Sequence, residues 1–149
     1  MDSRGFYALG IPNGTRKEEN GMAKKLTKKQ IEKMAFEIRQ FLLDNHLWVD
    51  VCIYFNGKSL GTSDENGFHY NDPDAVCIRE NVDPRDYFPY VGDILSMSFE
   101  GDLCGCLNCY GEYGHAFDVK IQNGLGDIFS KYGCYYELGH HWNLTLYPI

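Results

Sequence analysis

The sequence lacks any long apolar run, and it has few cations after residue 43. No segment holds the roughly 18 consecutive apolar residues of a membrane-spanning helix, and the N-terminus has no apolar signal-peptide core. No internal repeat, low-complexity tract or glycine-rich phosphate-binding loop is present. These absences predict a soluble, cytoplasmic protein and argue against a membrane protein or a nucleotide-binding enzyme.

The cations are concentrated near the N-terminus. Nine of the 14 Lys and Arg residues lie in residues 1–43, whereas residues 44–149 hold five of them against 16 Asp and Glu. The second part therefore contributes −11 to the net charge of −7. An acidic body of this kind repels nucleic-acid phosphates and attracts basic surfaces. The sequence thus favours a protein with a basic protein partner and without direct contact to nucleic acid or membrane.

The length of 149 residues predicts one domain. Residues 1–23 contain scattered glycines and no periodic apolar pattern, which predicts a flexible leader before a folded domain over residues 24–149. Six cysteines are many for this length. Without an export signal, we expect reduced thiols and no disulfide framework.

A helix is predicted over residues 28–45. Thr27 and Gln30 match a capping box, and apolar residues recur behind them at helical spacing. These residues are Ile31, Met34, Ala35, Ile38, Phe41 and Leu42. Lysines crowd the first turns, where cations oppose the helix dipole. They indicate either a solvated face or a basic contact.

Alternating apolar residues predict several antiparallel strands. Residues 48–55 alternate and lead into Asn56-Gly57, a strong hairpin signal, with a return strand over 58–62. A polar loop or wide turn is expected over 63–74. Further strands are expected at residues 75–79, 93–100, 134–138 and 142–147. In the strand over 93–100, Leu95, Met97 and Phe99 are expected to face inward, and Ser96 and Ser98 outward.

Two later helices complete the predicted fold. One covers residues 103–110 behind Asp102 as N-cap, and the other covers 117–132 and ends at Gly133. The order of elements indicates an α+β fold. We expect a single antiparallel sheet of about five or six strands, with the N-terminal helix and the two later helices packed on one face.

The string Cys104-Gly-Cys106-Leu-Asn-Cys109 is the closest approach to a metal motif, with His115 six residues further on. On a helix, however, Cys104 and Cys106 point about 200° apart, so the sulfurs would not converge. No second Cys-x-x-Cys pair is present. We therefore expect structural cysteines and no cofactor. A small metal-binding module that uses these four residues is the alternative.

Two Cys–His pairs are candidates for nucleophilic catalysis. Cys134 and His140 could meet across the final hairpin, and Cys77 with His69 is a second pair. Neither pair lies in a recognisable nucleophile turn, and Asp64-Glu-Asn-Gly67 lacks the later ligands of a calcium loop. The sequence therefore predicts that the protein is not an enzyme.

Acidic and aromatic residues interleave through residues 63–113. Carboxylates around aromatic anchors suit an interface with a basic protein. The candidate contact residues, expected mostly at turns or strand ends, are Asp72, Asp74, Asp83, Asp86, Tyr87, Tyr90, Glu100, Asp102 and Glu112. The alternative is a soluble cytosolic protein without a special partner.

This combination of small size, acidic bias, a lone α+β domain and no enzyme motif resembles the small acidic inhibitor proteins of phages and mobile elements, including anti-CRISPR and anti-restriction proteins. The resemblance is one of style over the whole chain, and no motif carries individual residues across. It implies a non-enzymatic inhibitor that offers carboxylates to the cationic channel of a nuclease or another nucleic-acid-handling protein. The oligomeric state follows from none of these patterns.

Overall fold

A computed structural model describes residues 25–149, and the predicted leader lies outside the described residues. The first part comprises α3 (Lys28–Asp44), β1 (Val51–Phe55), β2 (Lys58–Gly61), β3 (Ser63–Asp64), β4 (Gly67–Phe68) and β5 (Cys77–Glu80). The second part comprises the short 3-10 helix η1 (Pro84–Asp86), β6 (Ser96–Phe99), α4 (Asp102–Leu107), α5 (His115–Lys131), β7 (Cys134–Leu138) and β8 (Asn143–Pro148).

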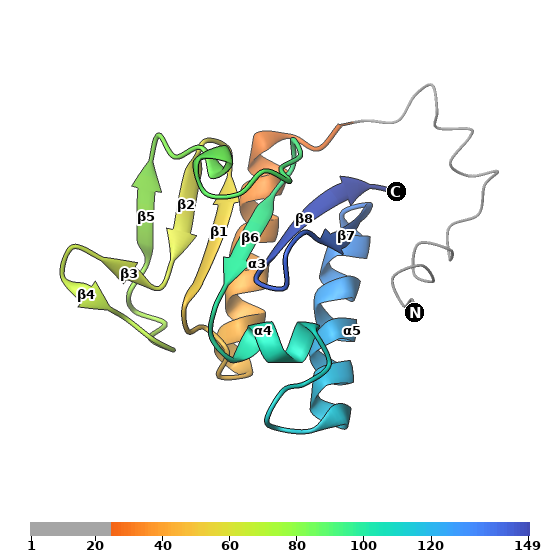
Figure 1. Cartoon of the computed structure of the whole chain (residues 1–149). Coiled ribbons are helices and arrows are strands. Elements are labelled where there is room, and N and C mark those ends of the chain that lie inside the picture. The colour runs from red at the N-terminus through yellow and green to blue at the C-terminus, as the bar shows by residue number, and fades with distance from the viewer. Residues whose placement is uncertain (1–24) are drawn as a thin grey trace.

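Six strands form one antiparallel sheet in the order β5-β2-β1-β6-β8-β7, and β3 and β4 form a separate two-stranded hairpin. Helices α3 and α5 cover one face of the large sheet, and α4 lies at one end of it against α5 (Figure 1). The core between helices and sheet includes Met34, Ile53, Met97, Phe129 and Leu144. The predicted α+β class, the antiparallel sheet and the three helices are therefore confirmed.

Helix α3 begins at the predicted capping box. Gln30 donates its backbone N–H to Thr27 Oγ1 at 3.1 Å, and Thr27 donates its own N–H to Gln30 Oε1 at 2.9 Å. The stripe predicted from helical spacing is largely buried, with Met34, Ala35 and Ile38 fully so. The box therefore fixes where the helix starts, and the stripe fixes which side faces the sheet.

We expect Thr27→Ala to lower the free energy of unfolding by about 1 kcal/mol, because the Gln30 N–H loses its acceptor. Thr27→Ser keeps that acceptor and should stay within about 0.5 kcal/mol of the wild type. Urea unfolding followed by circular dichroism measures both values. Equal losses in the two variants would show that the cap hydrogen bond does not stabilise α3.

Two turns have the backbone geometry predicted from the sequence. Asn56 and Gly57, between β1 and β2, have φ angles of 51° and 76°. Positive φ at both central positions is the hairpin turn that Asn-Gly favours. Gly133, after α5, has φ of 75° and ends the helix as expected.

Three local expectations were wrong. Residues 63–74 contain the β3–β4 hairpin, in which Asp64 Oδ1 accepts the Asn66 N–H at 2.8 Å. Gly101, not Asp102, occupies the N-cap position of α4. Ser96 was expected to face solvent but is only 1% exposed, since its hydroxyl pairs with Thr145 Oγ1 beneath the loop before β6. The hairpin is a local feature that the polar composition hid, whereas for Ser96 a contact with a distant segment overrode the local pattern.

Candidate functional site

The predicted contact residues are on the surface but do not form one patch. Eight of the nine are exposed, and Asp72 is half-buried. Asp72 and Asp74 lie in the turn before β5, where Asp72 Oδ1 accepts the Asp74 N–H at 2.9 Å. The other seven belong to two groups, one around η1 and one around α4.

Asp83 precedes η1 and Asp86 is its last residue, with cations nearby. Asp83 Oδ1 lies 3.5 Å from Arg85 Nη1. An adjoining groove of about 710 Å³ is lined by Asp83, Arg85, Lys25 and Lys28, among others. Because both signs of charge meet here, this end of the molecule does not present an unopposed acidic field.

Tyr87 and Tyr90 belong to the loop that covers the helix-free face of the sheet. The Tyr87 ring lies 5.7 Å from the Tyr54 ring, and the Tyr90 ring lies 5.6 Å from that of His140. Between them, Phe88 is buried against Tyr54 and Trp142. Both tyrosines keep about half of their surface exposed, at 58% and 52%, but their first role is to hold this loop on the sheet.

The second group lies around α4 and the start of β1. We name it the acidic end; it comprises Asp50, Tyr70, Glu100, Asp102, Glu112 and Tyr113. Tyr70 donates its hydroxyl to Asp50 Oδ1 at 2.6 Å, and Tyr113 donates to Asp102 Oδ2 at 3.2 Å. Glu100 donates its backbone N–H to the Asp50 carbonyl at 3.0 Å. Residues far apart in the sequence are thus held beside one another.

The carboxylates of the acidic end act on its phenols. The charge and hydrogen bond of Asp102, followed by the charge of Glu112, raise the pKa of Tyr113. The hydrogen bond to Asp50 raises the pKa of Tyr70 in the same way. Both phenols therefore remain neutral donors at physiological pH, and their rings stay fixed next to negative charge.

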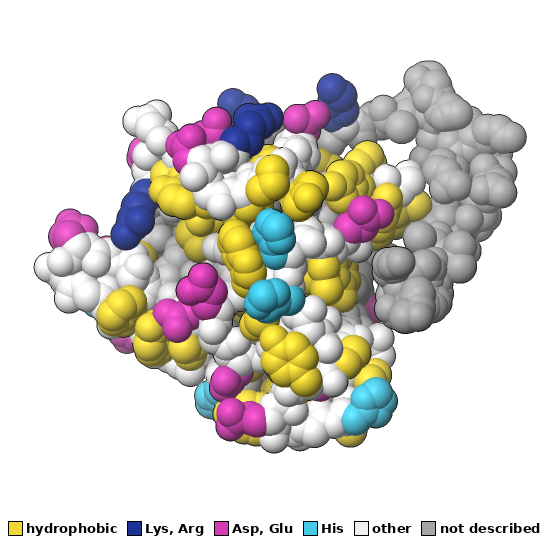
Figure 2. All heavy atoms as spheres, viewed as in Figure 1, with side chains coloured by type: hydrophobic (Ala, Val, Ile, Leu, Met, Phe, Trp, Pro, Cys, Tyr) yellow, Lys and Arg dark blue, Asp and Glu magenta, His cyan; other side chains and the backbone are white. Residues whose placement is uncertain are grey.

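Figure 2 shows how the charges divide on one face of the molecule. Lys and Arg side chains lie along the upper edge and beside β5. Over α4 and the sheet end next to it, acidic, hydrophobic and histidine side chains appear without Lys or Arg. On this face the acidic end is therefore separated from the basic residues.

The three cysteines of the metal alternative have separate partners. Cys104 Sγ donates to the His141 carbonyl at 3.3 Å, and Cys109 Sγ lies 3.3 Å from Gln122 Nε2. Burial, together with the nearby Asp118 carboxylate, raises the pKa of Cys106 to about 12. Among residues 25–149, neither these thiols nor His115 belong to a group of ligand atoms close enough to share a metal ion.

The two Cys–His pairs have different outcomes. Cys134 pairs with Pro148 at one end of the β7–β8 hairpin, whereas His140 lies in the turn at the other end. The strand rise from Cys134 to Leu138 alone is about 13 Å, and His140 lies beyond Leu138 in the turn, so the idea that they meet was wrong. Burial raises the pKa of Cys134 to about 11. His69 and Cys77 do come together, with Asp64 between them.

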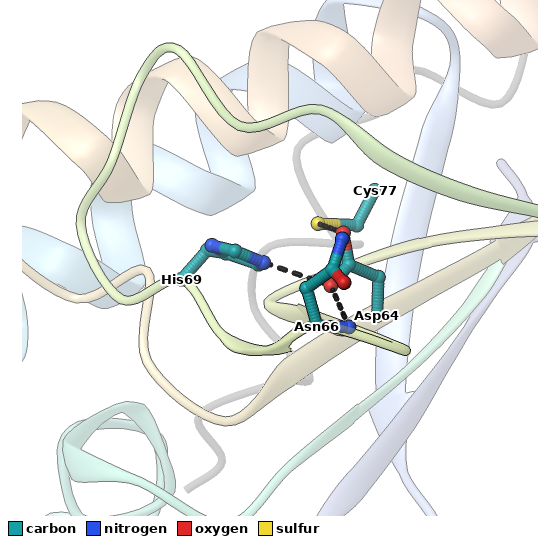
Figure 3. A network of polar contacts seen from close by, with 4 residues as sticks. All are labelled: Asp64, Asn66, His69 and Cys77. Carbon is teal, nitrogen blue, oxygen red and sulfur yellow. Dashed lines mark hydrogen bonds and ion pairs between the residues drawn. The ribbon is translucent and has the colours of Figure 1, made fainter.

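Asp64, His69 and Cys77 form a compact polar cluster (Figure 3). His69 Nε2 lies 2.8 Å from Asp64 Oδ1, and Cys77 Sγ lies 3.7 Å from Asp64 Oδ2. One ligand atom from each residue lies within 4.8 Å of the other two. Burial, followed by the Asp64 carboxylate, raises the pKa of the Cys77 thiol.

Strand pairing brings the cluster together. The register of β2 and β5 places Cys77 opposite Gly61, a few residues before Asp64. The β3–β4 hairpin then turns the chain back, and His69 donates its N–H to the Thr62 carbonyl at 2.8 Å. A cavity of about 240 Å³ adjoins the cluster and has Cys77 and Ser63 in its lining.

Sequence reasoning missed two parts of these sites. Asp50 was not a candidate, because no local sequence pattern predicts its contact with Tyr70. Its backbone has a φ angle of 54°, and its side chain accepts the Tyr70 hydroxyl hydrogen bond. Asp64 was considered only as part of a calcium loop. A prediction of the pairing between β2 and β5 would have placed Asp64 near His69 and Cys77.

The chain matches no protein-family model, no curated protein and no solved structure. Within residues 25–149, no helix combines the length and apolar character that crossing a bilayer requires. The fold and surface define a small α+β protein with an acidic, tyrosine-bearing end and an adjoining Asp–His–Cys cluster.

Proposed function

We propose that this chain is a non-enzymatic interaction protein that binds and inhibits a basic, nucleic-acid-handling protein, in the manner of anti-CRISPR and anti-restriction inhibitors. The observation that carries this proposal is the acidic end. There, four carboxylates surround two exposed tyrosines, and two of the carboxylates accept hydrogen bonds from the tyrosine hydroxyls.

The chemistry of the acidic end suits an arginine- and lysine-rich surface. Clustered carboxylates accelerate the encounter with a cationic partner and discriminate against acidic ones. Tyr113, 57% exposed, offers a ring on which a guanidinium can stack. Because Asp102 already orients Tyr113, less conformational entropy is lost when a partner binds.

The acidic residues divide into two groups, which allows a matched test. Glu100→Lys with Asp102→Lys changes the acidic end, and Asp83→Lys with Asp86→Lys changes the mixed-charge region around η1. Each double variant shifts the net charge of −7 by the same amount, about +4 at neutral pH. We expect the first to weaken binding at least about tenfold and the second less than about twofold, since steering depends on where the charge lies.

The partner is captured with the tagged full chain from cells that carry a restriction or CRISPR nuclease, purified, and titrated against each variant. Phage plating efficiency on those cells gives the inhibition readout, and a melting curve checks each fold. Affinity should also fall at least about tenfold between 0.1 and 1 M salt, as the Debye length shrinks from about 10 to 3 Å. Equal weakening by both double variants, or binding that ignores salt, would contradict the proposed surface.

A further inference from the structure

The Asp64–His69–Cys77 cluster borders the acidic end, because Tyr70 follows His69 and the cavity lined by Cys77 also has Asp50 and Glu100 in its lining. The three residues of the cluster have no part in the proposed function. Its three side chains come from β3, from the residue after β4 and from the start of β5. They differ in chemistry, yet their ligand atoms lie within 4.8 Å of one another. Each is a donor that binds transition metals in proteins.

The distances are close to those of a metal site. Tetrahedral zinc, with bonds of about 2.0–2.3 Å, places its ligand atoms about 3.3–3.7 Å apart. The 3.7 Å between Cys77 Sγ and Asp64 Oδ2 already fits this range. The 2.8 Å between His69 Nε2 and Asp64 involves the other carboxylate oxygen, Oδ1. Because one ligand atom from each residue lies within 4.8 Å of the other two, small side-chain rotations would bring all three into that range.

The charges of the cluster also favour a cation. Cys77 is 7% exposed and its sulfur lies 3.7 Å from a carboxylate oxygen. A free thiolate there would be desolvated and repelled by Asp64, which the charges of Arg39 and Arg79 only partly offset. A divalent ion between the two groups removes that repulsion and replaces the lost hydration. His69 and Asp64 keep 26% and 31% of their side-chain surface exposed, which leaves an entry path and room for a fourth ligand.

We propose that Asp64, His69 and Cys77 bind one zinc-like transition-metal ion, with the fourth position open to water. The donor set selects this class of ion: a thiolate and an imidazole suit zinc, cobalt and iron(II), whereas calcium and magnesium require oxygen ligands. The backbone around the site supports the geometry, because Asn66 donates its N–H to Asp64 at 2.8 Å and orients the carboxylate.

The same geometry argues against a catalytic thiol. In a nucleophile–base pair the imidazole contacts the thiol, but here His69 Nε2 contacts Asp64 instead. The thiol lies 3.7 Å from a carboxylate oxygen, Asp64 Oδ2, and this negative charge disfavours the thiolate that attack requires. A metal ion could bind to all three side chains at once, whereas the Asp64 carboxylate would oppose ionisation of a nucleophilic Cys77 thiol.

The test uses the full chain, stripped with a chelator and returned to a reducing buffer free of competing thiols. Zn²⁺ is titrated against a chromophoric competitor, and Co²⁺ serves as a spectroscopic probe. We expect one equivalent of metal per chain and a thiolate-to-cobalt charge-transfer band together with tetrahedral d–d bands. Bound zinc should also raise the melting temperature of the wild type.

Three variants remove one ligand each: Asp64→Asn, His69→Gln and Cys77→Ser. Each should weaken zinc at least about a hundredfold, since even outer-shell changes weaken metal sites by about 10–100-fold. Cys77→Ser should also abolish the charge-transfer band. Matched controls are Cys109→Ser and His115→Gln, which change an exposed thiol and an exposed imidazole of the Cys104–His115 region and should bind as the wild type does.

A wild-type cobalt complex without the thiolate band would overturn the proposal, and so would unchanged zinc affinity in Cys77→Ser. Loss of metal in Cys109→Ser or His115→Gln, with retention in Cys77→Ser, would move the site to the Cys104–Cys109 string and overturn it as well. Because the cobalt band is recorded on the wild type, the test does not depend on the folding of any variant.

Discussion

Replacing Arg39 with methionine is expected to lower the free energy of unfolding by about 2–4 kcal/mol. Arg39 is only 6% exposed, and its Nη2 donates to the carbonyls of Pro73 at 3.0 Å and Ala75 at 3.2 Å. Its guanidinium also lies 5.9 Å from the centre of the Trp48 ring. Methionine retains much of the apolar stem but leaves both carbonyls without this donor.

The control for Arg39 is Arg79→Met, which removes the same charge from an exposed position on β5. It should change stability by no more than about 0.5 kcal/mol. Arg39 Nε has no hydrogen-bond partner among the described residues, so we expect a loss below the upper limit of that range. Chemical denaturation measures both variants, and a similar effect of the two would mean that the turn before β5 does not depend on Arg39.

Gly101→Ala is expected to lower the free energy of unfolding by about 2–3 kcal/mol. A Cβ atom at this position would lie 2.5 Å from the carbonyl oxygen of Val49. The obstacle is backbone, so no side-chain rotation relieves it, and the end of β6 must move away from the segment before β1. Glu100 and Asp102 flank this glycine, so the same substitution should also weaken partner binding.

Gly126→Ala is the matched control for Gly101. Gly126 lies inside α5, and a Cβ there meets nothing within 4 Å. Because alanine is the better helix former, this variant should gain up to about 1 kcal/mol. Thermal unfolding of the pair gives the comparison; opposite signs are expected, and a loss in both variants would indicate that Gly126 has a role beyond backbone entropy.

The fold was predictable wherever a signal is local. The capping box at Thr27, the Asn56-Gly57 turn and Gly133 each act on a few neighbouring residues, and all three are found as expected. Strand alternation also located the sheet, because one of its faces is covered by helices. Ser96 shows where strand alternation fails to predict burial, because Ser96 is covered by the loop before β6, which folds over the helix-free face of the sheet.

The sites depend on contacts that sequence order hides. Asp83 and Glu100 looked equivalent as acidic residues at turns, yet one lies beside Arg85 and the other beside Asp50. Composition records how much charge is present but not where it gathers. The Asp64–His69–Cys77 cluster likewise needs Cys77 to pair across from Gly61, and that register follows from the assembly of the whole sheet.

The strand order has a consequence for how the chain folds. The strand nearest the C-terminus, β8, lies inside the sheet between β6 and β7. The hydrogen bond from Ser96 to Thr145 joins residues 49 positions apart, and closing a loop of that length costs entropy before any contact compensates for it. The pairing of β1 with β6 is nearly as distant, since Val51 lies opposite Phe99, 48 positions away. We therefore expect the two local hairpins, β1–β2 and β7–β8, to form first and β6 to join them last, as in other folds dominated by distant pairings.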